Sequence, residues 1–267
     1  MSLGIIIFGA LGRMGKEIAE IALSDEAYHI QGAIEYKDHP SIGDDYGICL
    51  QKSSFNLTLT SSFTEINCEN SVCIDFSAPN RLTQLPIIAE KKCPLIIGTT
   101  GLSDEMITYA QTFSSDIPIL ISPNMSLGVN LMFLLTEMIT PHLKDDYDIE
   151  IVEAHHRFKK DSPSGTAKRL GEIVASALNC SYNSCIKDGR NEIASTERPK
   201  DEIGMHAIRG GDIVGDHTIL FAGIGERIEL RHMAHNRSTF ARGACIAAKW
   251  LDKQKPGIYS MRDMLGL

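Results

Sequence analysis

The sequence has no excess of positive charge. It carries 26 Lys and Arg residues against 34 Asp and Glu residues, which gives a formal net charge of −8 at pH 7, and its pI is about 5.6. A nucleic-acid backbone or an anionic membrane surface is held mainly by clustered basic side chains. We therefore expect neither nucleic acid nor membrane as a partner.

Long apolar runs are also missing. No stretch approaches the ~20 consecutive apolar residues that a membrane-spanning helix needs. The start of the sequence, Met1-Ser2-Leu3-Gly4, leads into an apolar strand without a basic leader or a cleavage site. We therefore expect a cytoplasmic protein.

Closely spaced cysteine pairs of the redox or zinc-binding type are absent as well. Of the seven cysteines, the closest pairs are Cys68 with Cys73 and Cys180 with Cys185, and both are wider than a Cys-x-x-Cys motif. Seven is an odd number, and the cytoplasm keeps thiols reduced. The sequence predicts seven free thiols and no metal site.

What is present is the composition of a globular protein, with 43% apolar and 22% charged residues in a chain of 267 residues, long enough for one to two domains. Up to residue 125, short apolar runs alternate with amphipathic stretches, which predicts a parallel sheet with helices. The predicted strands are Leu3–Phe8, Ile30–Glu35, Val72–Asp75, Leu95–Gly98 and Ile117–Ser122. The predicted helices are Arg13–Leu23, Arg81–Lys91 and Asp104–Phe113.

After a predicted helix at Ser126–Leu143, which marks a domain boundary, the pattern changes to longer strand-like runs around one helix. This pattern predicts a mixed sheet. The fold class is therefore α/β, with a Rossmann-type parallel-sheet domain and a second α+β domain. The remaining predicted elements are the strands Ile149–Ala154, Met205–Arg209, His217–Ala222 and Arg227–Met233, the helices Thr166–Leu178 and Thr239–Lys253, and an exposed polar excursion at Asn179–Glu202.

A glycine-rich turn directly follows the first strand and opens the first helix. Its sequence, Gly9-Ala10-Leu11-Gly12-Arg13-Met14-Gly15, has the context of a dinucleotide-binding turn, although its G-x-x-G-x-x-G register is less common than G-x-G-x-x-G. Small residues let the backbone approach a pyrophosphate, and the unpaired N–H groups of the helix start favour an anion.

Glu35 ends the second strand, twenty residues beyond Gly15, where an acid is expected to meet the adenine-ribose hydroxyls. The carboxylate repels a 2′-phosphate, whereas Lys37 attracts one. Tyr36 carries no charge and provides only an aromatic ring for stacking. The predicted cofactor is therefore NADH or NADPH, with NADH favoured. The turns Gly98-Thr99-Thr100-Gly101 and Ser122-Pro123-Asn124-Met125 end further strands, at the sheet edge where ligands of such folds bind.

The densest chemistry lies in one segment, Glu153-Ala154-His155-His156-Arg157-Phe158-Lys159-Lys160-Asp161-Ser162-Pro163-Ser164-Gly165-Thr166. Adjacent histidines on a strand point to opposite faces, so a shared zinc site is not expected. A proton donor and an anion-binding partner fit better. Lys159 and the N–H groups around Gly165 and Thr166 favour carboxylates, which predicts an acidic substrate. A solvated basic loop with an ordinary serine cap is the alternative.

These motifs resemble one family, 4-hydroxy-tetrahydrodipicolinate reductase, also called dihydrodipicolinate reductase. The resemblance also covers Ser126-Leu127-Gly128-Val129-Asn130, the run from Arg209-Gly210-Gly211-Asp212 to His217-Thr218, and Arg237-Ser238-Thr239-Phe240-Ala241-Arg242-Gly243-Ala244. It therefore spans the chain. Three positions depart from the family pattern: Phe158 stands where a histidine is often found, Met125 where an aromatic residue often is, and Tyr36 where an arginine often supports NADPH.

The resemblance implies hydride transfer from NAD(P)H to a cyclic, imine-bearing dicarboxylate in the diaminopimelate route to lysine. It implies a homotetramer formed through the second domain's sheet, with residues 1–126 and 237–267 binding the dinucleotide and residues 127–236 binding substrate. By position, it implies that His155 and Lys159 donate protons, that His156, Ser164, Gly165, Thr166 and Arg237 contact substrate, and that the cofactor contacts are Gly9, Ala10, Leu11, Gly12, Arg13, Met14, Glu35, Gly98, Thr99, Thr100, Ser122, Pro123, Asn124 and Met125.

Two other functions fit parts of the sequence. A two-domain dehydrogenase acting on another amino-acid-derived substrate, of the aspartate or homoserine type, would share the glycine turn, but the basic His-His segment argues against it. A dinucleotide sensor without catalysis would need the glycine turn but not His155 and Lys159.

Overall fold

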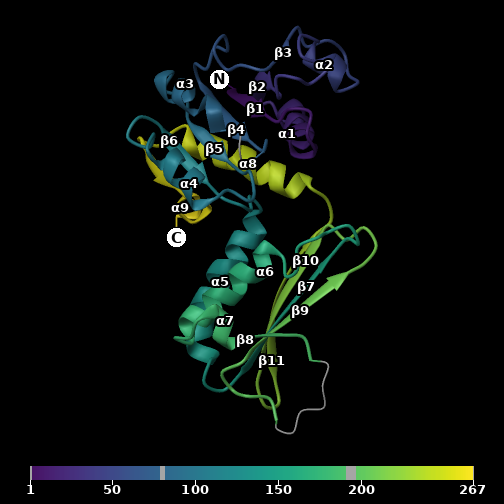
Figure 1. Cartoon of the computed structure of the whole chain (residues 1–267), viewed down its shortest axis with the longest axis vertical. Helices are drawn as coiled ribbons and strands as arrows, with labels where there is room; N and C mark the ends of the chain where they lie inside the picture. Colours follow the sequence, from purple (N-terminus) through teal and green to yellow (C-terminus); the bar gives the residue numbers. More distant parts are fainter. Residues whose placement is uncertain (1, 79–81, 191–196, 267) are drawn as a thin grey trace. The chain divides into compact units, whose positions relative to one another are not determined.

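The chain divides into two compact units (Figure 1), and the structure, a computed structural model, describes residues 2–78, 82–190 and 197–266. The first unit contains Met1–Leu127 and Arg237–Leu267, and the second contains Gly128–Asn236. Among the described residues, no helix is both long and apolar enough to cross a membrane.

The first unit is built on a parallel sheet of seven strands. The strand order is β12-β6-β5-β4-β1-β2-β3, and every neighbouring pair is parallel. From β3 to β6 this is the doubly wound order of dinucleotide-binding folds. The strands are β1 (Leu3–Phe8), β2 (Tyr28–Ile34), β3 (Leu59–Thr60), β4 (Ser71–Asp75), β5 (Leu95–Ile97), β6 (Pro118–Ile121) and β12 (Gly257–Tyr259).

Helices cover both faces of this sheet, which explains why β1 is apolar along its whole length. Ile5 and Ile7 point into a core shared with α1 and α8, whereas Ile6 and Phe8 point into a core shared with α3 and α4. The helices are α1 (Arg13–Ser24), α2 (Tyr46–Cys49), α3 (Leu85–Glu90), α4 (Asp104–Gln111), α8 (Ser238–Leu251) and α9 (Met261–Leu265), with a 3-10 turn at Leu82–Gln84. Arg81 of the predicted helix Arg81–Lys91 lies outside the described residues.

The second unit has a five-stranded mixed sheet in the order β11-β10-β7-β9-β8. β10 is antiparallel to β7 and β11, whereas β9 is parallel to β7 and β8. The elements are β7 (Asp148–His155), β8 (Ile186–Asp188), β9 (Ile203–Arg209), β10 (Gly215–Ala222), β11 (Arg227–Ala234), α5 (Leu127–Leu143), α6 (Gly165–Ala177) and α7 (Tyr182–Cys185). The two sheets confirm the predicted fold class.

One face of this second sheet packs against helices. Ile149, Ile151 and Phe221 are buried in a core with Met132 of α5 and Leu170 of α6, and Figure 1 shows both helices on the same side of the sheet. Alternate strand residues point to the opposite face, which no described helix of this unit covers.

The segment that follows α6 departs from the prediction in two respects. The predicted excursion Asn179–Glu202 is largely exposed over its described residues, but it includes a helical turn, α7, and a strand, β8, and its residues 191–196 lie outside the described ones. Cys180 and Cys185 form a disulfide, with their Cα atoms 6.4 Å apart, so the expectation of seven free thiols fails at this pair. The spacing along the sequence gave no sign of the pairing, because it is the turn of α7 that brings the two cysteines within bridging distance.

Candidate functional site

The glycine turn after β1 has the backbone geometry that a pyrophosphate site requires. Gly9 has a φ of +72°, a conformation that side chains disfavour. A Cβ atom on Gly15 would lie 2.2 Å from the carbonyl oxygen of Gly9, so only glycine lets α1 start this close to the turn. Because Gly12 caps α1 without a side-chain hydrogen bond, the first-turn N–H groups of Arg13 and Met14 are not capped by a side chain and suit an anion.

Glu35 is tied to this turn. Its Oε2 accepts a hydrogen bond from the N–H of Leu11 at 3.1 Å, and its Oε1 accepts one from the N–H of Tyr36 at 3.0 Å. The N–H groups of Gly9 and Ala10 both donate to the carbonyl of Ile34. Glu35 therefore braces the glycine turn in addition to facing the position predicted for a ribose.

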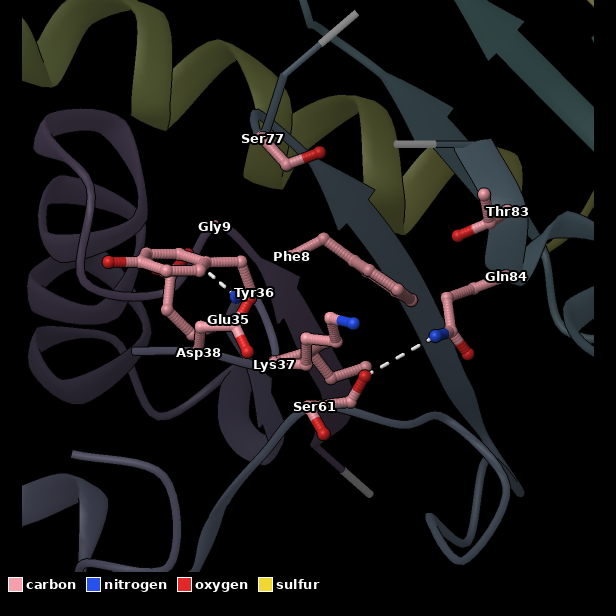
Figure 2. A pocket seen from close by; sticks show the side chains of 11 residues that line it. Phe8, Gly9, Glu35, Tyr36, Lys37, Asp38, Ser61, Ser77, Thr83 and Gln84 are labelled. Carbon is pink, nitrogen blue, oxygen red and sulfur yellow. Dashed lines mark hydrogen bonds between the residues drawn. The ribbon is translucent and has the colours of Figure 1, made fainter. Parts of the chain in front are cut away.

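A cavity of about 430 Å³ opens beside this turn, at the carboxyl ends of β1 and β2. Its size suits part of a dinucleotide. Figure 2 shows Glu35, Tyr36 and Lys37 along one side, with Thr83 and Gln84 across from them. The full lining is Phe8, Gly9, Ile34, Glu35, Tyr36, Lys37, Asp38, Ser61, Ser77, Thr83 and Gln84.

The other predicted cofactor residues follow β5 and β6 at the same edge of the sheet. Gly98 and Thr99 are buried and Thr100 is exposed. Thr99 donates a hydrogen bond from Oγ1 to the buried carboxylate of Asp75 at 3.1 Å, which also accepts from the N–H and hydroxyl of Ser77. Burial raises the pKa of Asp75, against the effect of these hydrogen bonds. Asp75 therefore joins the loops that follow β4 and β5.

In the turn after β6, Ser122 donates from its hydroxyl to the carbonyl of Asn124 at 2.8 Å, while Pro123 is exposed. Met125 is buried in a core with residues of α8, and its carbonyl lies against Gly243 of that helix. All predicted cofactor residues thus lie on the first unit, most of them at the carboxyl edge of its parallel sheet, where ligands of such folds bind.

The predicted catalytic histidine belongs to a buried polar cluster in the second unit. His155 ends β7 and is 8% exposed. Its Nδ1 lies 2.6 Å from Oε2 of Glu153, whose side chain is fully buried. Arg209 of β9 donates to both oxygens of the same carboxylate, at 2.8 and 2.7 Å. Although burial opposes ionisation, the hydrogen bonds from His155, Arg209 and the N–H of Ser164 lower the pKa of Glu153 to about 2.

Ser164 connects this cluster to the start of α6. Its hydroxyl accepts a hydrogen bond from the N–H of Ala167 at 3.2 Å, which makes Ser164 the N-cap of α6. The same hydroxyl lies 2.9 Å from Nε2 of His217. The ring of His217 packs edge-on against that of His155 with centroids 5.1 Å apart. Burial first, and then the proximity of His155, lower the pKa of His217 to about 3, so its ring is neutral at pH 7.

Three other predicted substrate residues and Lys159, the second predicted proton donor, lie near this cluster in the chain. His156 follows β7 and packs its ring against that of Phe158. Lys159 forms an ion pair with Asp161 at 2.9 Å. A substrate carboxylate that binds Lys159 would have to replace the Asp161 carboxylate. Gly165 and Thr166 form the first turn of α6. Arg237, the remaining predicted contact, is the N-cap residue of α8 and belongs to the first unit.

Sequence reasoning gave no role to Glu153, Arg209 or His217. Glu153 had a usable signal, because a residue two positions before His155 on a strand shares its face. Arg209 and His217 had none, since the pairing of β9 and β10 with β7 brings them to His155 from more than 50 residues away.

The doubly wound sheet, the glycine turn and the adjoining cavity define a dinucleotide-binding protein with a second unit that carries acid–base groups. Sequence comparisons give the family. The models of the N-terminal and C-terminal parts of dihydrodipicolinate reductase match residues 3–125 and 128–265. The chain belongs to the dihydrodipicolinate reductase family, as its motifs predicted, and this makes it an NAD(P)H-dependent oxidoreductase.

Similar proteins agree with this assignment. The 4-hydroxy-tetrahydrodipicolinate reductase of Geotalea uraniireducens is 46% identical over 264 residues, 98% of each chain, and that of Aquifex aeolicus is 46% identical over the whole of both chains. Among solved structures, dipicolinate-bound dihydrodipicolinate reductase from Paenisporosarcina sp. TG-14 matches 98% of this chain and 99% of its own, with a TM-score of 0.76 at 24% identity. A probable dehydrogenase from Thermotoga maritima matches 98% of this chain and 92% of its own, with a TM-score of 0.58 at 11% identity. These structural matches concern the fold.

Proposed function

We propose that the protein reduces 4-hydroxy-tetrahydrodipicolinate to tetrahydrodipicolinate in the diaminopimelate route to lysine. The observation that carries the proposal is the match of both halves of the chain to one reductase family, together with relatives of that name at 46% identity. The dipicolinate named with the Paenisporosarcina enzyme is a planar cyclic dicarboxylate, the ligand chemistry that the basic segment of this chain predicts.

The residues of the first unit fit the required cofactor. A φ of +72° at Gly9, the close approach of Gly15 to its carbonyl and the uncapped start of α1 suit a pyrophosphate. The bound dinucleotide would supply the hydride. In the proposal, the cofactor contacts are Gly9, Ala10, Leu11, Gly12, Arg13, Met14, Glu35, Gly98, Thr99, Thr100, Ser122, Pro123, Asn124 and Met125.

The second unit supplies the proton. In the net reaction, one hydride and one proton add to the conjugated imine and one water leaves. His155 is the proposed proton donor, through the Nε2 atom that its bond to Glu153 leaves available, and Lys159 is the second donor. The start of α6 and the basic side chains would neutralise the two substrate carboxylates. The proposed substrate contacts are His156, Ser164, Gly165, Thr166 and Arg237.

An assay that follows NADH absorbance with the product of the preceding synthase as substrate tests this proposal. General acid catalysis contributes about 10²–10⁴ in rate, so His155→Gln and Lys159→Ala should each lower kcat by at least about tenfold and leave the KM for NADH within about twofold. Lys160→Ala, which removes an exposed neighbouring ammonium, is the matched control and should keep its kcat. Wild-type turnover in His155→Gln and Lys159→Ala would remove these residues from the mechanism.

NADH is the preferred cofactor in the proposal. Glu35 lines the cavity with its carboxylate and repels a 2′-phosphate, and no arginine follows it. Lys37 lines the same cavity and acts in the opposite direction, so NADPH should also be used. Comparison of kcat/KM for NADH and NADPH measures this preference, and a tenfold higher kcat/KM with NADPH would contradict the proposed preference for NADH.

We also propose a homotetramer that assembles through the open face of the second unit's sheet. Val152 and Thr218 pair across β7 and β10 and point away from α5 and α6, and so does Leu220, two residues along β10. All three are partly exposed, whereas Ile151, Ile219 and Phe221 on the helix-covered face are fully buried. The cross-strand neighbours of Leu220 on this face are Glu150 and Glu229, so the face is mixed, and its partly exposed apolar side chains support association. The cytoplasm remains the proposed compartment, because five of the seven cysteines are free thiols, although the disulfide between Cys180 and Cys185 argues in the other direction.

A further inference from the structure

The carboxylate of Glu153 makes more contacts than any role assigned so far requires. Its side chain is fully buried. Oε2 accepts hydrogen bonds from Nδ1 of His155 at 2.6 Å and Nη1 of Arg209 at 2.8 Å. Oε1 accepts from Nη2 of Arg209 at 2.7 Å and from the N–H of Ser164 at 3.0 Å. Three elements, β7, β9 and the start of α6, therefore meet at one side chain.

Arg209 is what allows a carboxylate to remain ionised at this buried position. An uncompensated charge in the interior is strongly destabilising, and a two-pronged guanidinium contact supplies both the opposite charge and the matching geometry. Arg209 is itself anchored, because it also donates to the carbonyls of Ile208 and Asp161, each at 2.6 Å. Its orientation is thus fixed independently of His155.

We propose that Glu153, neutralised by Arg209, is a positioning residue that fixes the tautomer and orientation of His155 and ties them to the carboxylate-binding start of α6. This inference rests on the proposed function, in which His155 is the proton donor. Glu153 itself touches neither substrate nor cofactor in the proposal. It acts through His155 on one side and through the backbone of Ser164 on the other.

The tautomer follows from the contact at Nδ1. A carboxylate accepts hydrogen bonds only, so the Nδ1 of His155 must carry a proton. Nε2 is then the atom that gains and loses a proton, and it has no hydrogen-bond partner within the described part of the chain. Gly215 of β10 faces this atom, since a Cβ there would lie 3.0 Å from Nε2. A side chain at Gly215 would therefore crowd Nε2, and glycine avoids this.

The charged and titratable groups around His155 come from its own strand, from the two neighbouring strands and from the following loop. On its own strand lies Glu153, on β9 lies Arg209, and on β10 lies His217, which burial keeps neutral. The following loop adds the Lys159–Asp161 ion pair. Because Arg209 and Lys159 are each paired with a carboxylate, Glu153 is the one anion in direct contact with the imidazole among these groups.

The second contact of Glu153 extends its effect to the substrate side. The N–H of Ser164, the N-cap of α6, donates to Oε1, and the hydroxyl of Ser164 meets His217, which packs on His155. The chain of contacts therefore closes from Glu153 through Ser164 and His217 back to His155. A shift of the carboxylate would move the proton donor and the helix start together.

The Glu153→Gln variant separates these effects. Arg209 donates to both oxygens and so does not favour either orientation of the amide. The N–H of Ser164 is fixed by the backbone, so the amide oxygen should stay on that side and the amide NH₂ should turn towards His155. An NH₂ group donates to Nδ1, which forces the proton onto Nε2. We expect the ring ¹⁵N shifts of His155, assigned by comparison with His155→Gln, to change from the Nδ1–H to the Nε2–H pattern. We expect kcat to fall at least about tenfold, with the KM for NADH within about twofold.

Glu172→Gln is the matched control. Glu172 is exposed on α6, where it contacts Arg169 at 3.0 Å. The variant therefore breaks an Arg–Glu pair without touching His155 or the open face of the sheet, and kcat and the His155 ¹⁵N shifts should stay unchanged. If Glu153→Gln does not fold, Arg209→Lys keeps the charge but loses the two-pronged contact, and it should lower kcat in the same direction.

The failure of this inference is distinguishable from that of the proposed function. Unchanged kcat and unchanged ¹⁵N shifts in Glu153→Gln, beside an inactive His155→Gln, would overturn the inference and leave the proposed function standing. A shifted tautomer beside a fully active His155→Gln would overturn the proton-donor role instead. Equal loss of kcat in Glu172→Gln and Glu153→Gln, with His155 shifts unchanged in both, would reduce Glu153 to a general structural role.

Discussion

At the scale of single residues, the choice between the two nicotinamide cofactors depends on neighbouring side chains of opposite charge. Glu35 and Lys37 line the same cavity (Figure 2). The carboxylate is held by the N–H groups of Leu11 and Tyr36, so it cannot easily turn away from a 2′-phosphate. The ammonium of Lys37 lies on a flexible stem and can reach an added phosphate.

Lys37→Gln should therefore lower kcat/KM for NADPH at least about fivefold and change kcat/KM for NADH less than about twofold, because only NADPH carries the charge that Lys37 attracts. Steady-state kinetics with both cofactors measures the effect. Lys92→Gln removes a lysine paired with Asp116, outside the cavity, and serves as control. Equal losses with NADH and NADPH would show that Lys37 acts on the cavity in general.

Residues whose role follows from the local backbone could be predicted from the sequence. Gly9 and Gly15 follow a strand and open a helix, and their spacing already required a tight turn. The role of Glu153 needed more than local spacing, because its partner Arg209 comes from β9, 56 residues further along the chain. Ser164 was predicted as a substrate contact, yet its hydroxyl and its N–H are both engaged within the second unit, and its contact with substrate stays a prediction.

At the scale of helices and strands, length decided what could be predicted. β1 and α1 have enough residues for an apolar run or a 3.6-residue period to be recognised. The elements that were missed, α2, α7, β3, β8, β12 and α9, have between two and five residues each. Their positions are fixed by pairing with longer neighbours, as β12 is with β6, and not by their own sequence pattern.

Two strands of the second unit carry buried titratable groups that make stability depend on pH. The pKa of His217 on β10 is about 3, below its unfolded value of 6.5. The unfolded chain therefore binds an extra proton between these pH values, so the stability that neutral His217 allows is present above pH 6.5 and is lost as the pH falls towards 3. The pKa of Glu153 on β7 is about 2 in the folded protein, below its unfolded value of 4.5. The stability that ionised Glu153 provides is therefore also lost on acidification, as the pH falls from 4.5 towards 2.

His217→Gln should consequently flatten the acid dependence of unfolding. One proton corresponds to about 1.4 kcal/mol per pH unit, and the slope between pH 6.5 and 5 should fall by roughly that amount. Urea unfolding followed by circular dichroism at several pH values measures the slope. His29→Gln, at an exposed position of β2, is the control. An unchanged slope in His217→Gln would mean that His217 is not held neutral.

At the scale of the whole molecule, the sequence indicated a chain of two parts, because the pattern of short buried strands gives way to longer strands after residue 126. The structure has two compact units, and the chain passes from one to the other after Leu127 and before Arg237. The composition of the second sheet also carries a signal, since its open face keeps apolar side chains partly exposed. A sheet face without covering helices is stable in water only if it is polar or covered by another chain.

Leu220→Glu tests whether another chain covers the open face of the second sheet. The side chain points to the open face of β10 between Glu150 and Glu229, so in the proposed tetramer a carboxylate there would be buried beside two like charges. The variant should sediment or elute as a smaller species than the wild type, with its far-ultraviolet circular dichroism intact, whereas Met138→Glu, at a 58% exposed position of α5, should keep the wild-type mass. Light scattering coupled to size-exclusion chromatography gives the masses. A wild-type chain that is monomeric at micromolar concentration, or a Leu220→Glu variant of unchanged mass, would rule out assembly through this face.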